Sequence, residues 1–183
     1  HNTSKQQAHL QNVKSAIPYA TTPKTTTSST SSSSDEELKL NPIIDLSGWQ
    51  LPQDIDYDVL SNHISGAIVR VFGGSQISKD SNAASSNGID KSFKTHIKEL
   101  KKRDVPVAVY SYAQGASVKE MKEEARIFYK NASPYKPTYY WIDVEEETMP
   151  NMEEGVQAFL AELKRLGADK VGLYIGAYFM LEQ

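Results

Sequence analysis

Short apolar runs rich in β-branched and aromatic residues recur after residue 41, and stretches with helical spacing separate them. Five runs predict strands, and they cover residues 42–46, 67–72, 105–112, 138–144 and 170–175. Because single helices separate these strands, we expect parallel pairing with right-handed crossovers. A doubly wound sheet and a (β/α) barrel both satisfy the pattern, and the periodicity does not choose between them.

The segments between the strands carry helix signals. We expect Asp90 to cap the first main helix, and Ser117 with Glu120 forms a capping box ahead of the second. Gly167 stands where the third helix needs a left-handed final residue, and residues 57–64 predict a shorter helix. The apolar stripes of the three main helices are Phe93, Ile97 and Leu100; Val118, Met121, Ala125 and Phe128; and Val156, Phe159, Leu160, Leu163 and Leu166.

Residues 1–41 lack these patterns and predict a low-complexity tail or stalk. No aliphatic or aromatic residue occurs from 21 to 37, and residues 25–34 are all Ser or Thr. Such a stretch cannot bury enough apolar surface to fold, so we expect disorder there. The folded domain is therefore expected to span residues 42–183.

Composition narrows the possible functions. The chain has a net charge of −3, and a mildly acidic protein is a poor ligand for nucleic acid. No apolar run approaches the roughly 20 residues of a membrane span. Cysteine is absent, which excludes disulfides, thiolate zinc sites and a Cys nucleophile. Together with the Ser/Thr-rich stalk, the absence of cysteine favours a bacterial protein that is secreted or held at the cell surface. The chain opens on His1 rather than Met, as expected after removal of an upstream segment.

The candidate chemistry lies at the end of the fourth predicted strand. Alternate residues of a strand share a face, so Trp141, Asp143 and Glu145 project together. The two acidic Cα atoms would lie roughly 6.6 Å apart, which lets the carboxyls converge on one bond. Like charges this close disfavour joint ionisation, and one protonated carboxyl beside one carboxylate is what a glycosidase requires. A solvated acidic strand end is the alternative interpretation.

Other predicted strands bring further groups to the same edge. Asp45 ends the first strand, and parallel α/β sheets carry their active sites at the carboxyl ends of strands. Tyr110 and Tyr112 share a face of the third strand, and Tyr174 and Tyr178 flank the end of the fifth. Sugar rings stack on such aromatic surfaces, although ordinary core packing also explains a single Tyr.

Other chemistries lack their motifs. His1, His9, His63 and His96 do not stand in a metal-ligand spacing, so no metal is expected. Gly73-Gly74 is not followed by Lys-Ser/Thr, which excludes a phosphate-binding loop. The sequence also has no Gly-x-Ser-x-Gly motif, which a serine hydrolase of the α/β-hydrolase type would need. We therefore expect no cofactor.

Several motifs, in order, resemble glycoside hydrolase family 25 lysozymes over residues 43–183. They are Ile44-Asp45-Leu46-Ser47-Gly48-Trp49-Gln50, Ile55-Asp56-Tyr57, Ala67-Ile68-Val69-Arg70-Val71, Val107-Ala108-Val109-Tyr110-Ser111-Tyr112, Trp141-Ile142-Asp143-Val144-Glu145 and Val171-Gly172-Leu173-Tyr174-Ile175-Gly176. The resemblance implies a TIM-like (β/α) barrel, of which five βα units are visible, and an N-acetylmuramidase. Such an enzyme cleaves the β-1,4 bond between N-acetylmuramic acid and N-acetylglucosamine in peptidoglycan, with retention of configuration.

The resemblance also implies roles for individual residues. Glu145 would be the general acid and base. Asp143 would act as the nucleophile or would orient the substrate acetamido group for internal attack. Asp45 would bind sugar at the floor of the cleft. The residues expected to contact substrate are Arg70, Tyr110, Tyr112, Trp141 and Tyr174.

The sequence departs from the family in its length, because relatives continue through three more strands. A fragment of a longer chain, a wall supplied by another copy and a shortened fold are the three explanations, and we favour the first. An incomplete barrel would expose a strand edge through which copies could self-associate. The alternative function is a catalytically impaired cell-surface binding or adhesion protein on a lysozyme-like fold.

Overall fold

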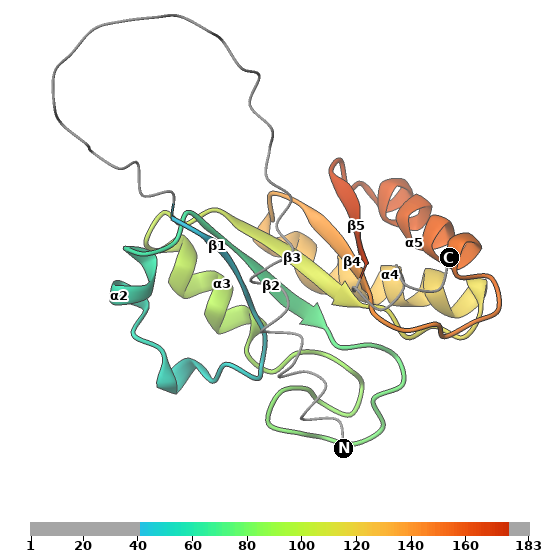
Figure 1. The fold of residues 1–183 in the computed structure, drawn as a ribbon, viewed down its shortest axis with the longest axis horizontal. Coiled ribbons are helices and arrows are strands. Elements are labelled where there is room, and N and C mark those ends of the chain that lie inside the picture. The colour runs from blue at the N-terminus through green and yellow to red at the C-terminus, as the bar shows by residue number, and fades with distance from the viewer. Residues whose placement is uncertain (1–40, 176–183) are drawn as a thin grey trace, which may run out of the picture. The chain divides into compact units, whose positions relative to one another are not determined.

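A computed structural model describes residues 41–175 of the chain, so the expected tail and Tyr178 lie outside the described residues. The described part contains one five-stranded parallel sheet whose strands lie side by side in chain order (Figure 1). Its strands are β1 (Ile43–Leu46), β2 (Gly66–Phe72), β3 (Val107–Tyr112), β4 (Tyr140–Val144) and β5 (Val171–Ile175). The five predicted strands are therefore confirmed, with small differences at their ends.

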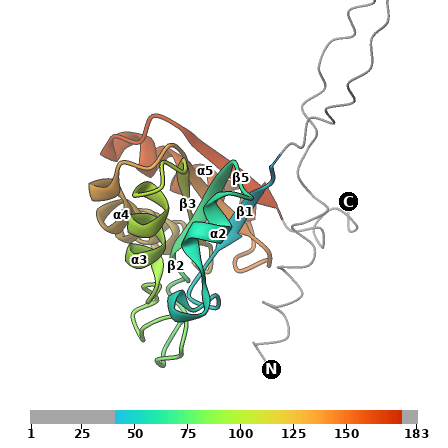
Figure 2. The same cartoon turned by 90° about the vertical axis from the view of Figure 1, so that its left-hand side faces the viewer.

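Helices connect consecutive strands. They are η2 (Pro52–Asp54) and α2 (Tyr57–Ser61) after β1, α3 (Phe93–Lys101) after β2, α4 (Val118–Ala132) and η3 (Ser133–Tyr135) after β3, and α5 (Met152–Leu166) after β4. The three long helices cover the same face of the sheet (Figure 2). Sequential strand order with helices on one face excludes the doubly wound alternative for this region. Within residues 41–175 the sheet is open, with β1 and β5 at its edges, so a closed barrel is not observed there.

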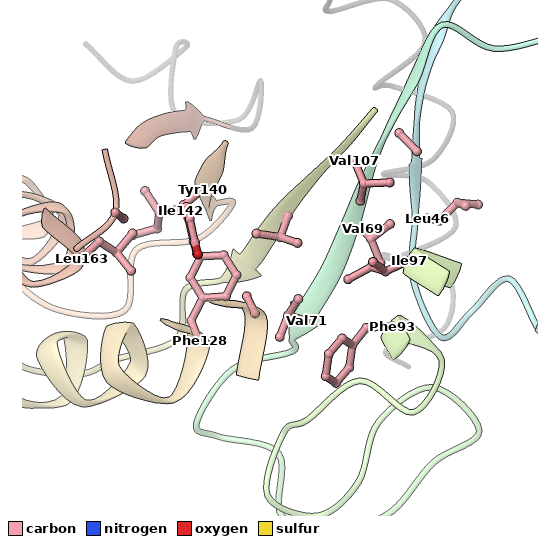
Figure 3. Close-up of a cluster of buried hydrophobic side chains, with 14 of the residues drawn as sticks. Leu46, Val69, Val71, Phe93, Ile97, Val107, Phe128, Tyr140, Ile142 and Leu163 are labelled. Carbon is pink, nitrogen blue, oxygen red and sulfur yellow. The ribbon is translucent and has the colours of Figure 1, made fainter. Parts of the chain in front are cut away.

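The hydrophobic core lies between the sheet and the three long helices (Figure 3). Val69 and Val71 of β2 and Ile142 of β4 are fully buried there, as the alternation of a strand predicts. Phe128 of α4 meets the ring of Tyr140 edge to face, with 5.6 Å between the centroids. This core fixes which side chains of each strand point to the opposite face, where the candidate chemistry lies.

Two of the three predicted helix ends are confirmed. The Ser117 side chain accepts a hydrogen bond from the Glu120 amide at the start of α4, and Gly167 ends α5 with a φ of 122°. The prediction for Asp90 is wrong: Ser92 is the N-cap residue of α3 and makes no side-chain cap bond. The Asp90 carboxylate instead bonds a residue of β2, a long-range partner that local sequence does not show.

Gly48 marks a close approach between two loops at the carboxyl edge of the sheet. A Cβ atom there would lie 2.1 Å from the carbonyl oxygen of Ala83. Gly48→Ala should therefore lower the free energy of unfolding by about 1–3 kcal/mol, because backbone rather than a flexible side chain would have to move. Thermal denaturation measures the loss. Gly66→Ala is the matched control, since its Cβ would make only ordinary contacts, and equal melting temperatures would contradict the loop packing.

Candidate active site

The face of the sheet that the long helices leave uncovered carries the candidate residues. Strand pairing aligns Asp143 with Tyr112 on one side and with Tyr174 on the other. Arg70, Tyr110 and Trp141 are aligned in the neighbouring row. Residues paired in a parallel sheet point to the same face, so β2 to β5 bring these side chains together. Asp45 of β1 projects from the same face and is half-buried.

Asp143 and Glu145 form an acidic pair at the end of β4. Asp143 is 2% exposed, whereas Glu145 is half-buried. Burial raises the pKa of Asp143 well above its ordinary value of 3.8. The charge of Glu145, a hydrogen bond with Glu145 and the charge of Asp45 raise this pKa further, while Arg70 opposes the shift. The free protein therefore keeps a proton on Asp143 at pH values where an ordinary carboxyl has lost its own.

The tyrosines around this pair stay neutral. Burial raises the pKa of Tyr110 well above 10.0, and burial also raises the pKa values of Tyr112 and Tyr174. Nearby carboxylates add to each shift because a phenolate would face their negative charge. Each phenol therefore remains a hydrogen-bond donor, and the Tyr112 hydroxyl donates to Glu146 at 3.4 Å.

Trp141 packs against residues of its own strand and of β5. Its ring stacks on Tyr139, with 4.4 Å between the centroids, and lies against Gly172 of β5. A Cβ atom at Gly172 would come within 2.6 Å of the indole ring. The half-buried Trp141 therefore joins β4 to β5 as well as lining the face beside Asp143.

Asp90 belongs to this region, although the sequence did not indicate it. Its carboxylate accepts a hydrogen bond from Arg70 Nε at 2.9 Å, and both side chains are almost fully buried. It also accepts from the backbone amides of Gly48 and Ser92 at 2.7 and 2.8 Å. Asp90 thus links β2, the loop after β1 and the start of α3 behind the candidate residues.

His96 and Glu124 are two further buried polar residues that the sequence did not assign to the site. His96 Nε2 lies 3.0 Å from the Ser47 carbonyl oxygen, which can only accept, so Nε2 donates and Nδ1 accepts from Tyr57 at 2.7 Å. The Glu124 carboxylate accepts from the Ser75 hydroxyl and the Gln114 amide. Each interrupts the apolar stripe of its helix, and that interruption was the available sequence signal. Both hold loops at the carboxyl edge of the sheet.

Helix length, helix hydropathy and the grouping of ligand side chains bear on a membrane span and on a metal site. Among the described helices, none is both long enough and apolar enough to cross a membrane. Across residues 41–175, no three His, Cys, Asp or Glu side chains form a group that could hold a metal ion.

Comparisons with known proteins agree with this arrangement. The family model described as glycosyl hydrolases family 25 matches residues 44–183. GHIP of Streptococcus pneumoniae, described as a virulence factor and a glycosyl hydrolase 25 participating in host cell invasion, is 58% identical. The match covers 79% of this chain and 63% of that chain, with a TM-score of 0.74. No curated protein sequence gives a significant match.

More distant structures share the fold. The catalytic domain of endolysin ply40 from bacteriophage P40 of Listeria monocytogenes is 24% identical over 75% of this chain and 64% of that chain, with a TM-score of 0.62. The modular autolysin LytC of Streptococcus pneumoniae, in complex with a synthetic peptidoglycan ligand, is 21% identical over 73% of this chain and 32% of that chain, with a TM-score of 0.56. The chain thus spans less than two thirds of each of these structures. From the family match and the likeness to GHIP, the chain belongs to the glycosyl hydrolases of family 25.

Proposed function

We propose that this chain carries the catalytic residues of a peptidoglycan hydrolase that cleaves the β-1,4 bond between N-acetylmuramic acid and N-acetylglucosamine. The observation that carries the proposal is the buried Asp143 carboxyl on the face of the sheet opposite the helices, whose pKa is raised by burial and by the charge of Glu145. A glycosidase needs one carboxyl that stays protonated above the pH at which ordinary carboxyls ionise, and a second carboxyl beside it. Membership of family 25 supports the same reaction.

Glu145 acts as the general acid, with the proton that the Asp143–Glu145 pair holds. Glu145 is the more exposed member, so it protonates the glycosidic oxygen and later activates the water that completes hydrolysis. In this proposal Asp143 holds the proton in the free protein and passes it to Glu145 during the reaction. Asp143 is left as a carboxylate, and its negative charge stabilises the positive charge that develops on the sugar ring.

Retention of configuration belongs to this proposal, as the family resemblance implies. Asp143 would act either as the nucleophile or as the group that orients the substrate acetamido group for internal attack. The anomeric configuration of the first product, followed by NMR, tests retention.

The surrounding side chains bind the glycan in this proposal. Arg70 supplies a buried donor, because its Nη2 has no hydrogen-bond partner among the described residues. Asp45 binds sugar hydroxyls beside the pair. The aromatic residues that would line the glycan are Tyr110, Tyr112, Trp141 and Tyr174.

The proposal extends to architecture and location. The catalytic domain would span residues 42–183 and belong to a TIM-like barrel, to which the described residues contribute strands β1 to β5; the strand edge at β5 is where further strands or another copy would pair. Peptidoglycan lies outside the cytoplasm, so an enzyme acting on it works after secretion or at the bacterial surface. Residues 1–41 would serve as the stalk.

Digestion of purified peptidoglycan distinguishes the hydrolase from the binding protein. We expect the suspension to clear and new reducing ends to form. Borohydride reduction followed by acid hydrolysis should convert the new ends to muramitol. Co-sedimentation with the wall without any new reducing end would reject the hydrolase and support an adhesion role, and glucosaminitol would reject the assigned bond.

The pH dependence of turnover follows from the shared proton. We expect a bell-shaped profile, because the reaction needs one proton on the pair. On the alkaline side, turnover falls as pH rises through the raised pKa of Asp143. Initial rates of reducing-end release across the pH range measure the profile, and a flat profile from acid to neutral pH would contradict the acid-base role. The groups that set the pKa of Asp143 are Asp45, Arg70 and Glu145.

A further inference from the structure

Asp90 is a carboxylate buried at a junction of three elements. Its Oδ2 accepts from Arg70 Nε in β2 at 2.9 Å and from the Gly48 amide after β1 at 2.7 Å. Its Oδ1 accepts from the Ser92 amide at 2.8 Å, just before α3. The residue is 2% exposed and lies next to none of the sequence motifs that suggested catalysis.

Arg70, the partner of Asp90, lies on the face of the sheet that carries Asp143. Arg70 is 3% exposed and is aligned in the sheet with Tyr110, on the face that carries Asp143. Its positive charge lowers the pKa values of both Tyr110 and Asp143. One of its nitrogens, Nη2, is buried without a hydrogen-bond partner among residues 41–175. A buried donor left unpaired in the free protein indicates a place where a ligand supplies the acceptor.

We propose that Asp90 is a positioning residue for glycan binding: it holds the Arg70 guanidinium by Nε so that Nη2 donates to an oxygen of the bound glycan. This inference rests on the proposed function and adds a residue to it. The bond to the Gly48 amide lets the same carboxylate fix the loop after β1 relative to Arg70. Asp90 acts through Arg70 and does not itself touch the substrate.

The chemistry of the carboxylate explains why an amide cannot replace it. Donors approach both Asp90 oxygens, two at Oδ2 and one at Oδ1. Asn offers one acceptor oxygen, so its NH₂ group would face at least one of these donors. In Asp90→Asn the Arg70 charge also loses its buried counter-charge. The guanidinium is then free to move away from the position that serves the glycan.

A double-mutant cycle on the full chain tests the inference. The variants are Asp90→Asn, Arg70→Met and the double variant, with Asp80→Asn as the matched control because Asp80 is exposed and pairs loosely with Lys91 at 3.8 Å. The measurements are the melting temperature, the KM and kcat on solubilised glycan strands, and the Kd for a peptide-free tetrasaccharide of alternating N-acetylglucosamine and N-acetylmuramic acid.

We expect each single variant to raise Kd and KM about tenfold with a smaller change in kcat, as loss of a ground-state contact requires. The double variant should bind no more weakly than the weaker single variant. It should also melt above both single variants, because it buries no unpaired charge. Asp80→Asn should match the wild type in all measurements.

Two results would overturn the inference. If Asp90→Asn lowered the melting temperature but kept the wild-type Kd, Asp90 would stabilise the loops without positioning Arg70 for the glycan. If the losses in Kd multiplied in the double variant, the two residues would act independently. Should Asp90→Asn fail to fold, the neutral double variant must still match Arg70→Met in Kd. An inactive wild type that binds the tetrasaccharide with the expected coupling would reject the hydrolase and keep the positioning role.

Discussion

Glu145→Gln is expected to lower the turnover of peptidoglycan by about a thousandfold, within the range of general acid-base catalysis. The amide has nearly the same shape as the carboxyl but cannot give a proton to the glycosidic oxygen or take one from water. Glu145 is half-buried at the end of β4, so the fold should survive. Release of reducing ends from purified peptidoglycan measures the loss, and circular dichroism checks the fold.

Glu147→Gln is the control for this prediction. Glu147 lies two residues further along the same acidic segment and is exposed, so the same change in charge should leave turnover within about twofold of the wild type. Equal turnover by Glu145→Gln and the wild type would show that Glu145 is not the general acid. Equal losses in both variants would mean that net charge, and not a specific proton transfer, explains the effect.

Asp143→Asn should lower turnover by about a hundredfold and stabilise the protein near neutral pH. Activity falls because a neutral amide cannot stabilise the positive charge that develops on the sugar. Stability rises because Asp143 is buried beside Glu145 and Asp45, and its ionisation at neutral pH opposes folding. A gain of about 1 kcal/mol is typical when such a strained functional group is neutralised.

The sign of the stability change depends on pH. The pKa of Asp143 is raised in the folded protein, so the folded state binds more protons than the unfolded state above pH 4 or so. Wild-type stability therefore falls as pH rises through this pKa, whereas Asp143→Asn has no carboxyl to ionise. The difference in melting temperature should be small at pH 3.5 and should grow toward pH 7. Asp169→Asn, at an exposed position before β5, should show no such growth.

The sequence predicted the elements well because burial on one face controls the periodicity of each. The apolar stripe of Phe93, Ile97 and Leu100 packs against β2 and β3 as its spacing requires. Strand order was beyond this reasoning, since periodicity reports which face is buried and not which strands are neighbours. The doubly wound sheet and the barrel remained equivalent until the order of β1 to β5 was known.

The sequence identified some residues of the candidate site but not their burial or their long-range partners. Alternation predicted that Asp143 and Glu145 share one face; the strand register aligns Asp143 with Tyr112 and Tyr174, whereas Glu145 lies one residue beyond β4. Their unequal burial was not predictable, because it depends on residues from β3 and β5. Asp90 was misassigned as a helix cap because a cap is a local pattern, while its bond to Arg70 crosses 20 positions of the chain.

Titration of the side-chain carboxyls shows whether Asp143 holds its proton above the ordinary pH range. Carbon-13 NMR of side-chain carboxyls, assigned with Asp143→Asn and Glu145→Gln, follows each group as pH changes. We expect the Asp143 carboxyl to titrate well above its ordinary value of 3.8. A single Asp143 titration step near that ordinary value would contradict the held proton on which the proposed hydrolysis depends.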